Sequence, residues 1–122
     1  VCSSDLSLDD VRAILRSQGM VPLTPNTLTT FEEFLHALDF VRLNGYALDD
    51  EECEIGASCI AAPIRGHKGK IVAALSISGA SVRFGADRRS ELVKLILDIS
   101  RSASTRLGFR QDEFATTVGD II

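Results

Sequence analysis

Residues 45–79, GYALDDEECEIGASCIAAPIRGHKGKIVAALSISG, decide the fold of this chain. Within them, residues 57–64 and 70–78 are apolar runs of strand length, and the Gly-His-Lys-Gly sequence between the runs is typical of a tight turn. Residues 46–48 predict a shorter strand before them, and residues 49–54 an acidic turn. The stretch therefore predicts an antiparallel β-hairpin preceded by a third strand.

Helical patterns flank these strands. Ser7 is the expected N-cap of a first helix that ends at Gly19, and Thr30 opens a T-x-x-E capping box for a second that ends at Gly45. Residues 22–29 form a connector between the two. A long helix is predicted from Asp87 to Gly108, and its expected inner face carries Leu92, Leu95, Ile96, Ile99, Ala103 and Leu107. This order predicts an α+β domain with an antiparallel sheet.

The hairpin register predicts a polar patch on one face of the sheet. Centring the turn on residues 67–68 places Cys59 opposite Ser76 and Ala57 opposite Ser78. Strand side chains alternate between faces, so Cys59, Ser76 and Ser78 point the same way. The other face is a continuous apolar layer. Small side chains with hydroxyls suggest a solvated face or a cavity for a ligand, with Asp49 as an acceptor at its rim.

Plainer interpretations of the same residues remain open. One alternative is that the serines simply face water; Cys59 suits a small buried apolar residue better than a nucleophile, and acidic turns are usually solvated. Cys53, Cys59, His36 and His67 lack the spacing of zinc ligands, so neither a metal nor another cofactor is expected. A Cys59–His67 nucleophile pair is disfavoured because His67 belongs to the hairpin tip.

Composition narrows the class of protein further. The chain has 122 residues, which is one domain or less, and its net charge of −4 does not suit a nucleic-acid-binding surface. Three cysteines without a disulfide pattern indicate reduced thiols in a cytoplasm. We expect no membrane span.

Several motifs together resemble the effector-binding domain of the IclR family of bacterial transcription regulators. They are GYALDDEECEIGASCIAAPI, the following AALSISG, the connector TPNTLTTFEEF and the closing helix ELVKLILDISRSASTRLGF. The resemblance implies a GAF-like sheet covered by helices and a small organic or aromatic acid as effector. It also implies that the ligand contacts of the family fall on Asp49, Cys59, Ser76 and Ser78.

Parts of the family pattern are absent from this sequence. These parts are the N-terminal winged helix-turn-helix, the first strands of the effector domain, and the segments that close the pocket from the other side. We therefore expect an incomplete sheet with an exposed edge. DNA would be bound only through the missing domain, and the full-length protein is expected to form a homodimer or homotetramer.

The expected organisation has three parts. Residues 1–6 match the translation of a sequencing-adapter end (GTG-TGC-TCT-TCC-GAT-CT) and are expected to be an assembly artefact. Residues 7–109 form the partial effector-binding domain, and residues 110–122 a C-terminal tail. Two other functions stay open: a stand-alone GAF-like sensory or protein-interaction module, and a thiol-dependent enzyme that uses Cys59. The upstream reading frame would test the first, and fast alkylation of Cys59 the second.

Overall fold

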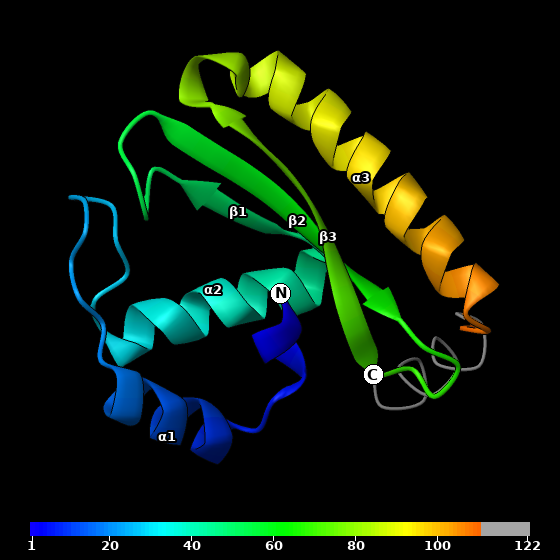
Figure 1. The fold of residues 1–122 in the computed structure, drawn as a ribbon, viewed down its shortest axis with the longest axis horizontal. Helices are drawn as coiled ribbons and strands as arrows, with labels where there is room; N and C mark the ends of the chain where they lie inside the picture. Colours follow the sequence, from blue (N-terminus) through cyan, green and yellow to red (C-terminus); the bar gives the residue numbers. More distant parts are fainter. Residues whose placement is uncertain (111–122) are drawn as a thin grey trace.

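The computed structural model describes residues 1–110 and has the α+β architecture expected from the sequence (Figure 1). The predicted tail therefore lies, from residue 111 onward, outside the described residues. In chain order the elements are the 3₁₀ turn η1 (Cys2–Asp5), α1 (Leu8–Gln18), α2 (Phe31–Asn44), β1 (Ala47–Asp50), β2 (Ala57–Arg65), β3 (Ile71–Ala80), the 3₁₀ turn η2 (Ser81–Arg83) and α3 (Ala86–Arg106).

The three strands form one antiparallel sheet in the order β1-β2-β3. In Figure 1, α3 runs along the strands. α2 lies next to β1, where the Phe40 ring packs edge-on against Tyr46 with 5.3 Å between the ring centroids. The outer edge of β3 has no strand partner within residues 1–110. The expectation of an α+β fold with a partial sheet is confirmed.

The predicted helix ends are also confirmed. The Ser7 hydroxyl accepts a hydrogen bond from the Asp10 amide at the start of α1. At the start of α2, the Thr30 hydroxyl accepts from the Glu33 amide at 3.2 Å and donates to the Glu33 carboxylate at 3.1 Å. Gly45 ends α2 with φ at +80°, a left-handed conformation that glycine adopts without a steric penalty.

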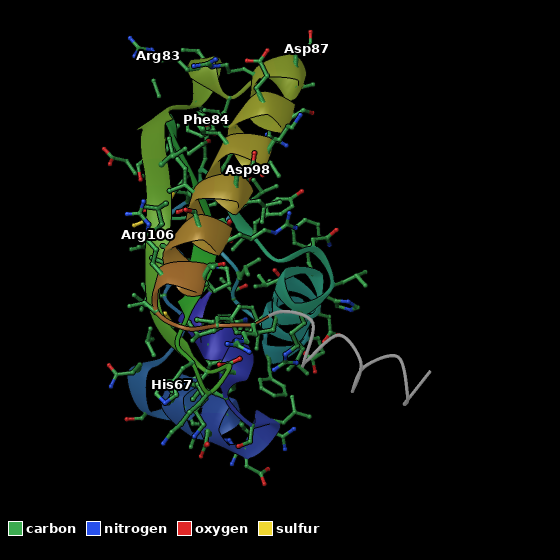
Figure 2. All side chains as sticks on the ribbon, turned by 90° about the vertical axis from the view of Figure 1, so that its right-hand side faces the viewer. His67, Arg83, Phe84, Asp87, Asp98 and Arg106 are labelled. Atoms are coloured by element: carbon green, nitrogen blue, oxygen red, sulfur yellow. The ribbon has the colours of Figure 1, made fainter. Side chains whose placement is uncertain are left out.

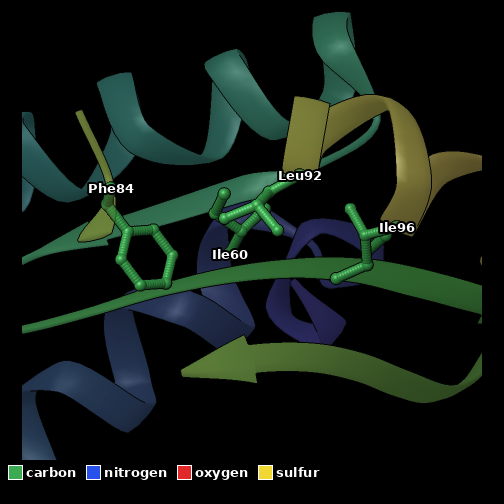
Figure 3. Packing of buried hydrophobic residues seen from close by; sticks show 5 residues of the cluster. Ile60, Phe84, Leu92 and Ile96 are labelled. Atoms are coloured by element: carbon green, nitrogen blue, oxygen red, sulfur yellow. The ribbon is translucent and has the colours of Figure 1, made fainter. Parts of the chain in front are cut away.

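The hydrophobic core lies between the sheet and α3. It consists of Ile60 and Ala62 from β2, Phe84 after η2, and Leu92 and Ile96 from α3, all at most 9% exposed (Figure 3). Around this cluster pack the partly buried Tyr46, Leu48, Leu75, Ile77, Val93 and Leu97. The apolar hairpin face predicted from the sequence therefore forms the core.

The inner face of α3 differs from the prediction. Leu95, Ile99 and Leu107 are 49%, 46% and 51% exposed instead of buried. Ser100 and Ser104 take the inward positions and are 3% exposed each. The reason is that Leu92 and Ile96 set the buried line, and the next residues four positions along that line are the two serines.

The N-terminal turn η1 joins α2 to the beginning of β3. The Arg42 guanidinium donates to the Ser4 carbonyl at 2.9 Å, and Asp5 accepts from the Ile71 amide at 2.7 Å. Asp5 also forms an ion pair with Arg65 at 3.4 Å. That residues 1–6 are foreign to the natural protein stays a prediction, which resequencing of the locus tests.

Candidate functional site

The three strands bring the four predicted site residues onto one face of the sheet. Asp49 on β1 is the partner of Cys59 on β2, and Cys59 is the partner of Ser78 on β3. Ser76 lies two residues from Ser78 and is the partner of Ala61. Since side chains alternate along each strand, this face is opposite to the one that carries Ile60 and the core.

Asp49, Cys59 and Ser78 form a row across the three strands. The hairpin register that produces this row is shifted by two residues from the predicted register. We expected Cys59 opposite Ser76, but its partner is Ser78. Gly69 adopts φ of +81° at the turn, and a second irregularity follows between Ile64 and Arg65, so β3 gains two residues relative to β2. An even shift keeps every side chain on its predicted face, because the side-chain period of a strand is two.

Asp49 is more central than predicted. The acidic residue was expected at the rim, ten positions before Cys59 in the sequence, yet the two are direct partners across β1 and β2. One carboxylate oxygen of Asp49, Oδ1, accepts a hydrogen bond from the Glu52 amide at 2.9 Å. Within residues 1–110 the other oxygen has no such donor, so it is available to a ligand.

The site face combines small side chains with unused hydroxyl groups. Asp49 and Cys59 are half-buried, whereas Ser76 and Ser78 are exposed. In the part of the chain that the structure describes, neither serine hydroxyl has a hydrogen-bond partner. Ala47 and Ala61 separate the polar groups and leave room above the strands. The face can therefore offer two hydroxyl donors, a thiol and a carboxylate acceptor to a small molecule.

The turn after β1 concentrates negative charge. Burial raises the pKa of Glu52 above its ordinary value of 4.5, and the neighbouring charges of Asp49 and Asp50 raise it further, while a hydrogen bond from the Asp50 amide opposes the change. Glu51 has φ of +58°, a left-handed conformation that costs a non-glycine residue about 1–2 kcal/mol. Other contacts must therefore hold this turn.

Those contacts come from the connector between α1 and α2. The side-chain amide of Asn26 donates to the Asp50 carbonyl at 2.9 Å. The Thr24 hydroxyl donates to the Glu51 carbonyl, and the Thr27 hydroxyl donates to the Glu52 carbonyl. We call Thr24, Asn26 and Thr27 the connector clasp. Three hydrogen bonds contribute about 1 kcal/mol each, which is enough to offset the strained conformation at residue 51.

Sequence reasoning missed the connector clasp. It treated residues 22–29 as a linker, although T-P-N-T carries a recognisable turn sequence. The Thr27 amide donates to the Thr24 carbonyl at 3.2 Å, and the Thr27 hydroxyl accepts from the Thr24 amide at 2.9 Å. This turn could have been predicted; its contact with a segment some 25 residues away could not.

Other features of the structure lie away from the site face. A cavity of about 200 Å³ is found between the end of β2 and α3, where Pro63, Ser100 and Ser104 are among its lining residues. His67 lies at the tip of the hairpin (Figure 2), whereas Cys59 is near the start of β2, at the end of the strand away from that tip. Among residues 1–110 no group of His, Cys, Asp and Glu could hold a metal ion, and no helix is long and apolar enough to cross a membrane.

Comparison with known proteins identifies relatives of this chain. The family model described as "Bacterial transcriptional regulator IclR C-terminal" matches residues 2–105. The HTH-type transcriptional regulator KdgR of Escherichia coli K12 is 37% identical over 106 residues, which are 87% of this chain and 40% of KdgR. The HTH-type transcriptional repressor AllR of the same strain is 37% identical over 105 residues, which are 86% of this chain and 39% of AllR.

Solved structures show the same relationship. The crystal structure of the C-terminal domain of E. coli KdgR matches with a TM-score of 0.81 and 36% identity, over 89% of this chain and 66% of that one. A double mutant of the inducer-binding domain of the PobR transcription factor from Acinetobacter, in complex with 3-hydroxybenzoic acid, matches with a TM-score of 0.73 and 30% identity, over 86% of this chain and 58% of that one. The chain thus spans about two fifths of its full-length relatives and two thirds of a solved domain.

Proposed function

Because this chain belongs to the family of IclR-type bacterial transcriptional regulators, as part of their C-terminal domain, we propose that it senses a small organic or aromatic acid for a DNA-binding regulator. The observation that carries this proposal is the row of Asp49, Cys59 and Ser78 across the three strands, with Ser76 beside it. These groups face away from the core and have polar atoms free for a ligand. The proposed role is binding, with no catalytic residue and no cofactor.

The chemistry of the row favours a hydroxy acid over a bare anion. The hydroxyls of Ser76 and Ser78 can donate to a carboxylate or a carbonyl oxygen of the effector. Asp49 would repel a carboxylate placed next to it, so its carboxylate is better suited to accept from a hydroxyl group of the effector. The complex of the PobR double mutant with 3-hydroxybenzoic acid supports this class, since that molecule carries both a carboxylate and a hydroxyl group.

Regulation would couple effector binding to DNA binding elsewhere in the protein. The net charge of −4 does not suit a phosphate-binding surface on this chain, so DNA contacts are assigned to an N-terminal helix-turn-helix outside it. The effector must bind one arrangement of the regulator more tightly than the other, because equal affinity shifts no equilibrium. We place the full-length protein in the cytoplasm as a homodimer or homotetramer.

Replacing a site serine tests the proposal. In the full-length protein, we expect Ser76→Ala to weaken binding of 3-hydroxybenzoate about fivefold to tenfold, because one hydroxyl donor to the acid is lost. Isothermal titration calorimetry measures the affinity, and pyruvate and lactate serve as further probes. Ser102→Ala, an exposed serine on α3, is the matched control. Equal affinities of wild type and Ser76→Ala for every acid that binds would refute the assignment.

A further inference from the structure

We propose that Thr27 is a positioning residue for the Asp49 carboxylate, and that the connector clasp thereby sets the geometry of the effector site. This inference rests on the proposed function for its purpose. The hydrogen bonds that carry it stand independently of any ligand. It assigns a role in ligand recognition to a segment that contributes no side chain to the site face.

Two hydrogen bonds to the backbone of Glu52 connect Thr27 to Asp49. The Thr27 hydroxyl donates to the Glu52 carbonyl, and the Glu52 amide donates to the Asp49 carboxylate at 2.9 Å. Fixing the backbone of residue 52 therefore fixes the direction of the N–H that orients the carboxylate. Loss of the Thr27 hydroxyl would directly release the peptide group between residues 52 and 53. It would also remove the acceptor of the Thr24 amide and so loosen Thr24, whose hydroxyl binds the Glu51 carbonyl of the peptide group that carries the Glu52 N–H.

The direction of the Thr27 hydroxyl is itself fixed. Its oxygen accepts from the Thr24 amide at 2.9 Å and from the Leu23 amide at 3.1 Å. Both lone pairs are thereby occupied, so the single hydroxyl proton is directed to the Glu52 carbonyl. Thr27 is half-buried, which shields this arrangement from competing water. The Thr27 hydroxyl thus has partners on Leu23, Thr24 and Glu52, which makes it a specific connection and not an incidental surface contact.

The other two members of the connector clasp act on neighbouring peptide groups. Thr24 and Asn26 donate to the carbonyls of Glu51 and Asp50, so three consecutive carbonyls are held by one four-residue turn. The clasp belongs to the segment between α1 and α2, while Asp49 belongs to the sheet. Any movement of that segment relative to the sheet would change the orientation of the Asp49 carboxylate.

Hydrogen–deuterium exchange tests the connection without a ligand. In the full-length protein, Thr27→Val is expected to accelerate exchange severalfold in peptides that cover residues 49–54, because the turn is released. Thr27→Ser keeps the hydroxyl and is expected to exchange like the wild type. Thr29→Val makes the same substitution at an exposed position of the connector and is the matched control. Unchanged exchange in Thr27→Val would overturn the proposal.

Binding of 3-hydroxybenzoate tests the consequence for recognition. Asp49→Asn and Thr27→Val are each expected to weaken binding about tenfold, and the double variant no more than Asp49→Asn alone, because Thr27 acts through Asp49. Thr27→Ser is expected to restore affinity. Wild-type affinity in Thr27→Val, or losses that add in the double variant, would overturn the positioning role.

The two experiments separate the inference from the proposed function. If none of the acids binds the wild-type protein, the proposed function fails, and the exchange experiment alone decides whether the clasp holds residue 52. If the acid binds and only Asp49→Asn weakens it, the proposed function stands and the positioning role fails. Should Thr27→Val unfold the protein, Asn26→Ala is the substitute, because it removes only the exposed donor to the Asp50 carbonyl. It is expected to accelerate exchange in the peptides that cover residues 49–54, by less than Thr27→Val would.

Discussion

The acidic residues 49–52 make different contacts although their charges are alike. Asp49 presents its carboxylate on the site face, held there by the Glu52 amide. Glu51 takes the left-handed conformation that reverses the chain, and its carbonyl is bound by Thr24. Glu52 is half-buried, and its burial together with the charges of Asp49 and Asp50 raises its pKa. A run of four acidic residues is therefore not one solvated patch, because each peptide group has its own partner.

The raised pKa of Glu52 predicts a pH-dependent stability. The folded chain keeps a proton on Glu52 at higher pH than the unfolded chain, so the free energy of unfolding falls as pH rises from about 4.5 through the folded pKa. Glu52→Gln keeps an acceptor for the Asp50 amide and removes this fall. We expect the variant to be more stable than the wild type at about pH 7 and similar to it at about pH 4.

Urea unfolding at several pH values measures this difference. Glu54→Gln, an exposed residue of the same turn, is the control and is expected to follow the wild type. A stability gain for Glu52→Gln that is equally large at both ends of the pH range would contradict the prediction, because it could not arise from ionisation.

At the scale of elements, β2 extends beyond its short partner β1 and must complete its hydrogen bonds in another way. The register leaves residues 62–65 without partners on β1. Pro63 lacks an N–H group, so it leaves no donor unpaired. The Arg65 amide donates to the Ser104 hydroxyl on α3 at 2.9 Å, and this hydroxyl donates to the Ser100 carbonyl at 2.8 Å. The inward serines of α3 thus complete the edge of the sheet.

Removing this hydroxyl is expected to cost stability. Ser104→Ala leaves the Arg65 amide without its acceptor in a site where Ser104 is 3% exposed. We expect the free energy of unfolding to fall by about 1–3 kcal/mol. Thermal or urea unfolding followed by circular dichroism measures it, with Ser102→Ala expected to stay within about 0.5 kcal/mol of the wild type. Equal stability of the two variants would show that the Arg65 amide finds another partner.

At the scale of the whole molecule, the sheet ends on an open strand. β3 is ten residues long, and residues 72–80 contain neither charged residues nor proline, the features that usually protect an edge. Asp5 covers only the Ile71 amide at its beginning. The solved KdgR domain has a further third of chain that this sequence does not match, which is consistent with a sheet that is partial here.

This edge predicts that the 122-residue chain associates in solution. Val72 is 61% exposed on β3, and we expect Val72→Lys to reduce association because a lysine on an edge strand opposes strand pairing. Val82→Lys, at a valine 91% exposed outside the strands, is the control and is expected to leave association unchanged. Size-exclusion chromatography with light scattering measures the mass. A monomeric wild-type chain would contradict the prediction.

The sequence by itself determined the local structure and the face of each strand residue. Caps at Ser7 and Thr30 and the stop at Gly45 are local signals, and alternation places Cys59, Ser76 and Ser78 together whatever even register the hairpin adopts. These features could be predicted because they depend on neighbours a few residues away. That the four residues bind an effector stays a prediction.

Only the tertiary structure decided how segments distant in sequence meet. It placed Asp49 directly opposite Cys59, turned Ser104 toward the Arg65 amide, and set the connector clasp against the acidic turn. Each of these is a hydrogen-bonded pairing between segments that no shared periodicity connects. Local patterns predict which face of a strand or helix a residue occupies. Which distant residue it pairs with depends on the strand register and on how each helix packs against the core.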